Sequence, residues 1–340
     1  MNRMPVKATA ISPANIAFIK YWGRKEGTED KDVIPSNGSI SMNIDNCYTV
    51  TTTEFSSRYK EDEIWIQFFG QNPQRVTGSQ FERVIAHVNR FRQLNNCDLK
   101  IKVVSENSFP SDAGIAASAS GFSALTMALA GAFKMKLKLK ELSILTRLAG
   151  SGSACRSVID GFVEWRVGYN SETSYAIQIA PPEFWDLADL VVVVKDEKKE
   201  FSSLHGHSVA HTSPFYKRRL ELLKKRIPLV RKAINKKDLF LLGELIEEDA
   251  VELHLIAMSS KPPIFYWNEG TMEVIHFLRQ IRKNGLLGYF TIDAGPNVHI
   301  ICLQKDLEKI DKEVKRLKNV LFTIKNSPCV GTRLISKHLF

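Results

Sequence analysis

Residues 105–121 read SENSFPSDAGIAASASG, and the rest of the chain is organised around them. Before this segment, Leu99, Ile101 and Val103 alternate with lysines, which predicts a strand. After it, apolar residues recur at helical spacing from residue 122 to residue 133, which predicts a helix. The loop between them consists almost wholly of Gly, Ala and Ser. We therefore expect a strand, a small-residue loop and a helix in succession.

A loop of this kind at the start of a helix suits the binding of a phosphate group. Small side chains let a polyanion approach the backbone, and the first N–H groups of a helix lack partners and lie at the positive end of its dipole. The alternative is a tight turn that packs against a neighbouring element, and composition does not decide between the two. The segment is neither a Walker A loop nor a dinucleotide-binding fingerprint, because the required Gly-Lys-Ser/Thr and glycine spacings are missing.

The composition is typical of a globular chain. Of the 340 residues, 44% are hydrophobic and 25% are charged. The length of the chain is enough for one large or two medium domains. The formal net charge of +10 fits nucleic acid, an acidic membrane surface or small polyanionic substrates. Because the basic residues are scattered and no RNA-binding, zinc-finger or basic-zipper pattern occurs, we interpret most of them as solvated helix faces.

The five cysteines are an odd number without C-x-x-C spacing, so neither a disulfide framework nor a zinc site is expected. The first residues lack the apolar core of a signal peptide, and no apolar run is long enough to span a bilayer. We therefore expect a cytoplasmic protein without a membrane partner.

Periodicity predicts further elements along the chain. The expected strands are 8–22 with a turn at 12–15, 47–55, 63–69, 161–166, 190–194, 287–292 and 298–303. The expected helices are 81–94, 139–149, 214–234 with a break at Pro228, 237–258, 271–283 and 306–318. The Pro181-Pro182 pair marks a boundary between an N-terminal lobe, residues 1–186, and a C-terminal lobe, residues 187–340.

Isolated reactive side chains lie in four turns or small-residue segments: Asn15 and Lys20, Ser118, Ser153 and Arg156, and Asp293. Each alone is more often structural, as a solvated charge, a helix cap or a turn residue. Together they suit chemistry on phosphates. Backbone amides and Ser118 would hold phosphates, and Arg156 offers a planar fork to a carboxylate or phosphate. Asp293 could accept a hydroxyl proton, with Lys20 keeping it ionised.

Four motifs carry a resemblance to a known family: ANIAFIKYWG at 14–23, NSFPSDAGIAAS at 107–118, GSGSACRS at 150–157 with GFVEW at 161–165, and DAGPN at 293–297. In this order they resemble the mevalonate diphosphate decarboxylases of the GHMP small-molecule kinase superfamily. The resemblance covers residues 8 to about 303. It implies a two-lobed α+β GHMP kinase fold, with an N-terminal ribosomal-protein-S5-like lobe and a C-terminal ferredoxin-like lobe.

The resemblance implies an activity as well. The expected reaction is the ATP- and Mg²⁺-dependent decarboxylation of mevalonate 5-diphosphate to isopentenyl diphosphate, by a homodimer. Within the family, the alternatives are decarboxylation of mevalonate 5-phosphate and a kinase that stops at the 3-phosphate. A basic nucleic-acid-binding protein is a more distant alternative, which the paired small-residue loops at 105–121 and 150–157 disfavour.

The resemblance also assigns site residues. The catalytic group is Asp293, Lys20 and Arg156; the substrate-binding group is Asn15, Tyr21, Ser153, Arg156 and Ser203; the ATP-binding group is Ser108, Gly114, Ser118 and Trp65, which walls the adenine pocket. No metal ligands are assigned.

The chain departs from the usual family pattern at five places: Arg24, Gly38, Asp112, Ala117 and Leu204. Asp112 adds a negative charge near the phosphates, and Leu204 stands where some bacterial members carry an Arg near the substrate phosphates. These departures leave the number of phosphates on the substrate open. They do not touch the Asp293 and Lys20 pair, which relatives that only phosphorylate mevalonate lack, so decarboxylation is the expected outcome.

Overall fold

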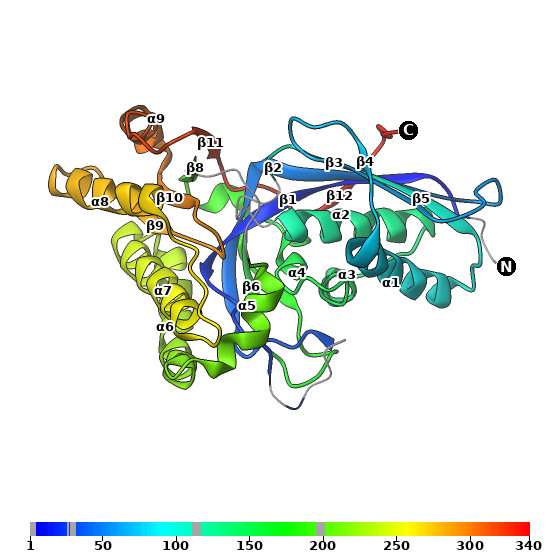
Figure 1. The fold of residues 1–340 in the computed structure, drawn as a ribbon, viewed down its shortest axis with the longest axis horizontal. Helices are drawn as coiled ribbons and strands as arrows, with labels where there is room; N and C mark the ends of the chain where they lie inside the picture. The colour runs from blue at the N-terminus through cyan, green and yellow to red at the C-terminus, as the bar shows by residue number, and fades with distance from the viewer. Residues whose placement is uncertain (1–4, 26, 28–31, 111–116, 195–200) are drawn as a thin grey trace.

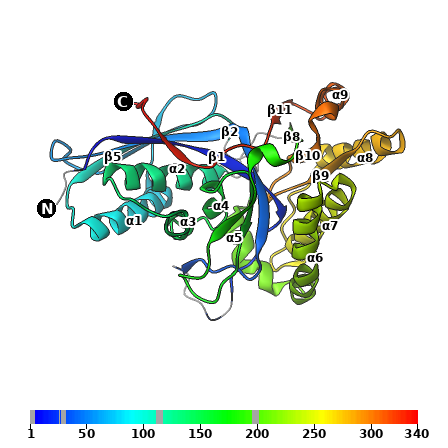
Figure 2. The same cartoon turned by 180° about the vertical axis from the view of Figure 1, so that it is seen from behind.

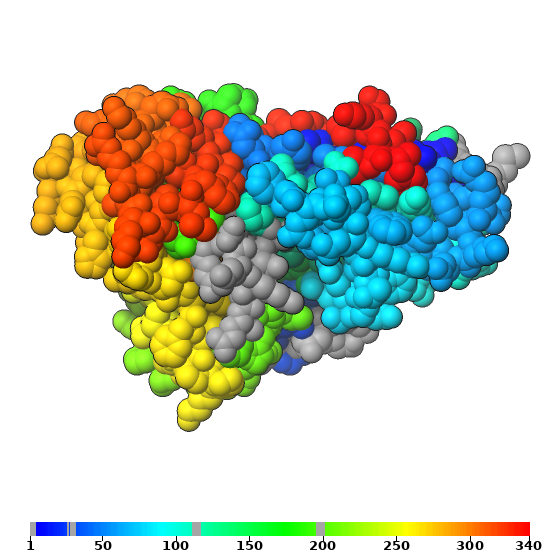
Figure 3. All heavy atoms as spheres, turned by 45° about the horizontal axis from the view of Figure 1, so that its top comes forward, coloured from blue at the N-terminus to red at the C-terminus, as the bar shows by residue number. Residues whose placement is uncertain are grey.

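The structure is a computed structural model, and it describes residues 5–25, 27, 32–110, 117–194 and 201–340. In the described part of the chain, two sheets lie side by side, each with helices against it (Figure 1). Figure 3 shows the blue and cyan N-terminal residues on one side of the molecule and the yellow to orange residues on the other. This two-lobed α+β arrangement is the one predicted.

The larger sheet has the order β12-β1-β2-β5-β3-β4, and β6 pairs with β2 and with β7. Its strands are β1 (Ala8–Ile19), β2 (Ser39–Ser56), β3 (Glu63–Gln67), β4 (Gln74–Arg75), β5 (Lys100–Asn107), β6 (Phe162–Trp165), β7 (Ala176–Ala180) and β12 (Arg333–Ile335). The helices α1 (Gly78–Asn95), α2 (Ala117–Ala132), α3 (Leu139–Arg147) and α4 (Ala154–Ser157) lie along one face of it (Figure 1). The expected strand and helix on either side of the small-residue loop are thus β5 and α2.

The smaller sheet is antiparallel, with the order β11-β8-β10-β9. Its strands are β8 (Leu187–Val193), β9 (Gly288–Thr291), β10 (Val298–Leu303) and β11 (Phe322–Asn326). The helices of this part are α5 (Ser203–Val209), α6 (Tyr216–Lys236), α7 (Leu239–Ser259), α8 (Glu269–Lys283) and α9 (Gln304–Val314), with 3₁₀ turns at Pro182–Phe184 and Ala210–Thr212. No helix in the described ranges is both long enough and apolar enough to cross a bilayer.

Strand β8 is buried on both faces, as its continuous apolar run predicts. On one face, Ala188, Leu190 and Val192 pack in a core with residues of α8 and α9. On the other face, Val191 and Val193 share a core with residues of α6, α7, β1 and β2. The second core joins the two sheets and fixes the end of β1 against the second lobe.

The turn predicted at residues 12–15 is wrong, because β1 continues through it. The pairing with β2 shifts register there instead: Pro13 lies opposite Tyr48, whereas Ala14 lies opposite Ile44. The residues of β2 between these partners form a bulge, which accommodates a proline that cannot donate to the ladder.

The predicted break at Pro228 is also wrong, because α6 runs through this residue without interruption. Pro228 lies on the exposed side of the helix, so the carbonyl that loses its N–H partner can be hydrated. Buried residues on both sides of it, Leu223, Val230 and Ile234, hold the helix in the shared core.

The last strand lies outside the lobe that the sequence boundary assigned to it. Strand β12 pairs antiparallel with β1, so residues 333–335 belong to the larger sheet although the expected C-terminal lobe was 187–340. Figure 2 shows the red C-terminal segment running back across the larger sheet.

Candidate active site

A cavity of about 660 Å³ lies where the two lobes meet, a volume suited to a small-molecule site. Its walls come from the end of β1, from β3, β5, α1, α2, α4 and α5, and from the segment after β9. Seven of the predicted site residues line this cavity: Lys20, Tyr21, Ser118, Ser153, Arg156, Ser203 and Asp293.

Lys20 and Asp293 form an ion pair at the cavity, with 2.5 Å between Nζ and Oδ1. Lys20 follows the last residue of β1, and Asp293 follows β9 in the other lobe. The Lys20 side chain is 2% exposed and that of Asp293 is 22% exposed. The Lys20 ammonium also donates to the carbonyl oxygen of Ala17, at 2.8 Å.

Burial and the partner's charge have opposite effects on the pKa of each residue in this pair. Burial opposes ionisation of Asp293, yet the adjacent Lys20 cation outweighs it and holds the pKa of Asp293 below its ordinary value. Burial lowers the pKa of Lys20, and Asp293 counteracts part of that change. Asp293 is therefore an ionised acceptor at neutral pH, beside an ammonium group that can neutralise developing negative charge.

Arg156 is held by neutral oxygens. Its Nε donates to Ser41 Oγ at 2.9 Å, its Nη2 donates to Asn15 Oδ1 at 2.9 Å, and its Nη1 donates to Ser39 Oγ. Asn15 is fixed in turn by donating to Ser157 Oγ at 2.8 Å. Burial lowers the pKa of Arg156 from its ordinary 12.5. Because these partners carry no charge, the guanidinium remains available to an anion in the cavity.

Tyr21 closes one side of this region. Its ring stacks on His207 with 4.2 Å between centroids and meets the edge of Trp165 at 4.9 Å. Gly152 of the GSGSACRS motif must be a glycine, because a Cβ at this position would lie 2.5 Å from the Trp165 ring. Burial raises the pKa of Tyr21 to about 12, so its hydroxyl stays a donor.

The two small-residue segments meet through serine hydroxyls. Ser118, in the first turn of α2, lies 3.2 Å from Ser151, and Ser151 lies 3.4 Å from Ser153. Ser118 is exposed at the cavity. Hydroxyls and the unpaired amides at the start of a helix are suited to phosphate oxygens.

The apolar end of the cavity is formed by side chains from β3, β5 and α2, namely Ile64, Ile66, Val103, Phe122 and Leu125. Trp65 does not contribute to this wall, contrary to the expectation for the adenine pocket. Strand alternation places it on the opposite face of β3 from Ile64 and Ile66, where its Nε1 donates to Glu63 at 3.4 Å.

Ser108 is likewise outside the cavity lining. Its hydroxyl accepts from the amide of Tyr48 and donates to the carbonyl of Asn46, both at 2.9 Å, so it ties the end of β5 to β2. Gly114 lies outside the described residues, as does Asp112. Leu204 is exposed, and Gly38 has a reason to lack a side chain, because a Cβ there would lie 3.1 Å from the carbonyl oxygen of Trp165.

Sequence reasoning missed several groups at or beneath the site. His207 lines the cavity, accepts from the amide of Gly23 at 3.1 Å through Nδ1, and has its pKa lowered to about 3 by burial. It is therefore neutral, with its proton on Nε2. Asp249 and Arg219 contact the main chain of Lys20. The charges of α6 and α7 resemble solvated helix faces in the sequence, so pattern alone gave no signal for them.

Comparisons with known proteins identify the family of this chain. Residues 12–176 match a model of the diphosphomevalonate decarboxylase-like N-terminal domain, and residues 189–330 match the mevalonate 5-diphosphate decarboxylase C-terminal domain. The diphosphomevalonate decarboxylases of Candida albicans and Saccharomyces cerevisiae are each 33% identical to this chain, over 89% of it and over 86% and 79% of their own lengths.

Solved structures give the same result. Mevalonate diphosphate decarboxylase from Staphylococcus aureus is 35% identical, with a TM-score of 0.89 over 98% of this chain and 99% of its own. The complex of MDDEF with MVAPP, AMPPCP and magnesium is also 35% identical, with a TM-score of 0.88 over the same shares. The predicted GHMP kinase fold is thereby confirmed, and the chain belongs to the diphosphomevalonate decarboxylase family.

Proposed function

We propose that this chain converts mevalonate 5-diphosphate and ATP to isopentenyl diphosphate, ADP, phosphate and CO₂, a step of isoprenoid biosynthesis. The observation that carries the proposal is the Lys20–Asp293 ion pair, which faces the same cavity as the start of α2 and the guanidinium of Arg156. That combination offers a base for an alcohol, donors for a nucleotide's phosphates and a cation for a carboxylate.

Each residue of the site has a separate role in the proposed reaction. Asp293 orients the C3 hydroxyl and accepts its proton as the oxygen attacks the γ-phosphorus of ATP, while Lys20 stabilises the developing charge. Arg156, which is held in place by Asn15, binds the substrate carboxylate, and Tyr21, Ser153 and Ser203 bind its diphosphate. The C3–O bond then breaks with the phosphate, and the electrons of the bond to the carboxylate form the carbon–carbon double bond as CO₂ leaves.

The nucleotide fits the other end of the cavity. The apolar wall that includes Ile66 and Phe122 accommodates a flat base, and Ser118 at the start of α2 lies on the side where phosphates would meet the substrate. No group of three or more metal-binding side chains occurs among the described residues. Mg²⁺ would therefore be bound mainly by the nucleotide phosphates, as is usual for this ion, and would neutralise their charge.

The test offers the enzyme ATP and Mg²⁺ with mevalonate, its 5-phosphate or its 5-diphosphate, and measures ADP and CO₂ separately. The expected result is equal ADP and CO₂ from the 5-diphosphate. ADP without CO₂ from every substrate would mean a kinase that stops at the 3-phosphate. CO₂ from the 5-phosphate alone would show that the phosphate end, where Leu204 departs from some relatives, accepts one phosphate fewer.

The proposal also includes a cytoplasmic location and a homodimer, and the homodimer rests on the family resemblance. One chain has a mass of 38.4 kDa. Light scattering on the purified protein should give twice that mass, and a value close to that of one chain would contradict the dimer.

A further inference from the structure

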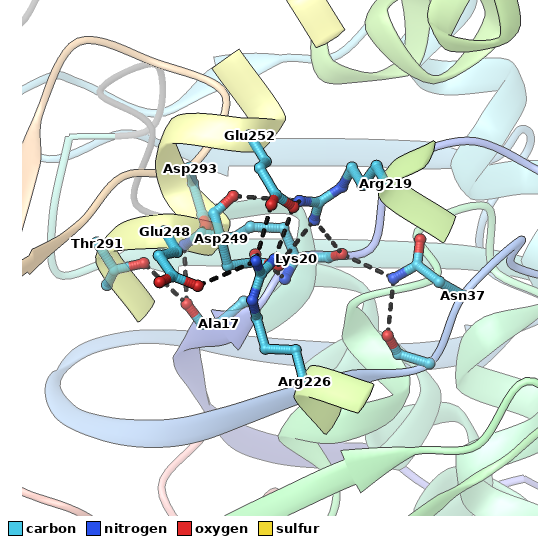
Figure 4. A network of polar contacts seen from close by, with 11 residues as sticks. Ala17, Lys20, Asn37, Arg219, Arg226, Glu248, Asp249, Glu252, Thr291 and Asp293 are labelled. Atoms are coloured by element: carbon cyan, nitrogen blue, oxygen red, sulfur yellow. Dashed lines mark hydrogen bonds and ion pairs between the residues drawn. The ribbon is translucent and has the colours of Figure 1, made fainter. Parts of the chain in front are cut away.

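The main chain of Lys20 is held from both sides by groups of the second lobe and of a neighbouring loop. Its N–H lies just beyond the last residue of β1 and donates to Asp249 Oδ2 at 2.8 Å. Its carbonyl oxygen accepts from Asn37 Nδ2 at 2.8 Å and from Arg219 Nη2 at 3.3 Å. Figure 4 shows these groups converging on Lys20 from different elements.

Asp249 of α7 and Arg219 of α6 form a closed arrangement with the main-chain N–H and C=O of Lys20. The Arg219 Nη2 that reaches the Lys20 carbonyl also donates to Asp249 Oδ1 at 3.0 Å. Asp249 is 0% exposed and Arg219 is 2% exposed. Around them, Glu252 accepts from Arg219 at 3.2 Å and from Arg226 at 2.6 Å (Figure 4), and among the described residues it has no hydrogen bond or ion pair with Lys20.

Stability alone is a weak reason for such an arrangement. Taking two charges out of water costs several kcal/mol each, and well-packed apolar residues often do as well as a buried pair. The contacts are, however, directed at the main chain of one residue, Lys20, whose ammonium faces Asp293. A lysine side chain has four rotatable bonds, so its Nζ is placed accurately only if its main chain is fixed.

The partner aspartate is tied to the same point. The carbonyl oxygen of Ala17 accepts both from Lys20 Nζ, at 2.8 Å, and from Thr291 Oγ1, at 3.1 Å. Thr291 ends β9, two residues before Asp293. The ammonium is therefore set by its fixed main chain on one side and by a shared acceptor with the Asp293 strand on the other.

We propose that Asp249, together with Arg219, is a positioning residue of the reaction: it fixes the main chain of Lys20 so that the ammonium meets Asp293 at the distance that phosphoryl transfer requires. This rests on the proposed function. Loss of the contact lets the ammonium shift, and misplacement of a catalytic group by about 1 Å can cost about 100-fold in rate. Substrate binding is spared, because Arg156 and Ser118 are positioned by other elements.

The experiment compares Asp249→Asn with Glu252→Gln in the full-length protein. Asp249→Asn keeps an oxygen for the Lys20 N–H but turns an amide donor toward Arg219, which opens the closed arrangement. Glu252→Gln, on the same helix, removes one charge from the same ion-pair network without touching Lys20. CO₂ release gives kcat and KM for both substrates, and thermal unfolding shows that each variant is folded.

We expect Asp249→Asn to lower kcat by at least tenfold with both KM values within about threefold of wild type, and Glu252→Gln to keep kcat within about twofold. Equal losses in the two variants, or an unchanged kcat in Asp249→Asn, would overturn the proposal. If Asp249→Asn does not fold, Arg219→Lys decides, because it keeps the positive charge but lacks the fork that reaches the Lys20 carbonyl: a kcat loss at constant KM supports positioning, and an unchanged kcat refutes it. Absence of CO₂ from the wild-type protein would instead refute the proposed function.

Discussion

Replacing Asp293 by Asn tests the mechanism with a change of very few atoms. The side chain keeps its size and one oxygen for the Lys20 ammonium, but it loses its negative charge and its ability to take a proton. The cavity and the apolar wall at Ile66 and Phe122 are untouched. Any large effect on turnover therefore comes from the chemistry at the C3 hydroxyl.

The expected loss follows from the geometry. A positioned general base contributes about 10²–10⁴ in rate, or about 3–5 kcal/mol of activation free energy at about 1.36 kcal/mol per tenfold change. The free energy of unfolding should fall by no more than the lower end of this activation range. Lys20, which is 2% exposed, loses its charged partner but keeps the amide oxygen of the new side chain and the carbonyl oxygen of Ala17 as acceptors. Breaking a fully buried ion pair costs about 3–5 kcal/mol, and we expect the loss of unfolding free energy here not to exceed about 3 kcal/mol, because Asp293 is partly exposed.

Three measurements separate these effects: CO₂ release under saturating substrates, nucleotide affinity by calorimetry, and unfolding in denaturant. We expect kcat to fall by about 10²–10⁴ while nucleotide affinity changes by less than about threefold. A folded Asp293→Asn protein whose kcat stays within tenfold of wild type would remove Asp293 from the proton transfer.

Four further predictions concern the substrate, the nucleotide, pH and the core. Arg156→Lys removes the planar fork and should raise KM for mevalonate 5-diphosphate by about 10–100-fold, the equivalent of one or two charged hydrogen bonds, with KM for ATP nearly constant in steady-state assays; equal changes in both would argue against a carboxylate-binding role. Phe122→Ala opens the apolar wall and should weaken nucleotide binding about tenfold by calorimetry, and an unchanged affinity would place the base elsewhere. Because burial lowers the pKa of Lys20 from 10.5, its ammonium is lost as pH rises through that lower value, so kcat should decline on the alkaline side with an apparent pKa below 10.5; a profile that is flat up to that pH would contradict a catalytic ammonium. Phe91 is 0% exposed in the core of the larger sheet, so Phe91→Ala should lower the free energy of unfolding by about 3–5 kcal/mol. A loss of less than about 1 kcal/mol, measured by urea denaturation, would contradict its place in the core.

The elements that the sequence predicts well are those with strong local patterns. The alternation before the small-residue loop and the helical spacing after it correspond to β5 and α2, and the apolar run at 190–194 lies in the doubly buried β8. Local signals failed where tertiary packing decides. Pro13 and Pro228 suggest interruptions, but a bulge in β2 and a solvent-facing carbonyl allow the strand and the helix to continue.

Some residues of the site could likewise be predicted from the sequence, and others could not. Lys20, Arg156 and Asp293 stand in motifs distinctive enough to be found from the sequence, and the structure brings them together. The side of β3 that faces the cavity could not be read from Trp65, since a one-residue shift exchanges the two faces of a strand. Asp249 is separated from Lys20 by 229 positions and sits in an acidic run that resembles a hydrated surface, so only the folded chain reveals their contact.

The return of the C-terminal segment to the larger sheet has a mechanical consequence. The chain passes between the sheets once before β8 and again between β11 and β12, where the first crossing contains Pro181 and Pro182 and the second contains Pro328. The two connections are adjacent, because Pro182 of the first and Pro328 of the second line the same pocket. Together with the core shared by β1, β2, β8, α6 and α7, these two connections tie the lobes to each other and keep Asp293 of one lobe beside Lys20 of the other.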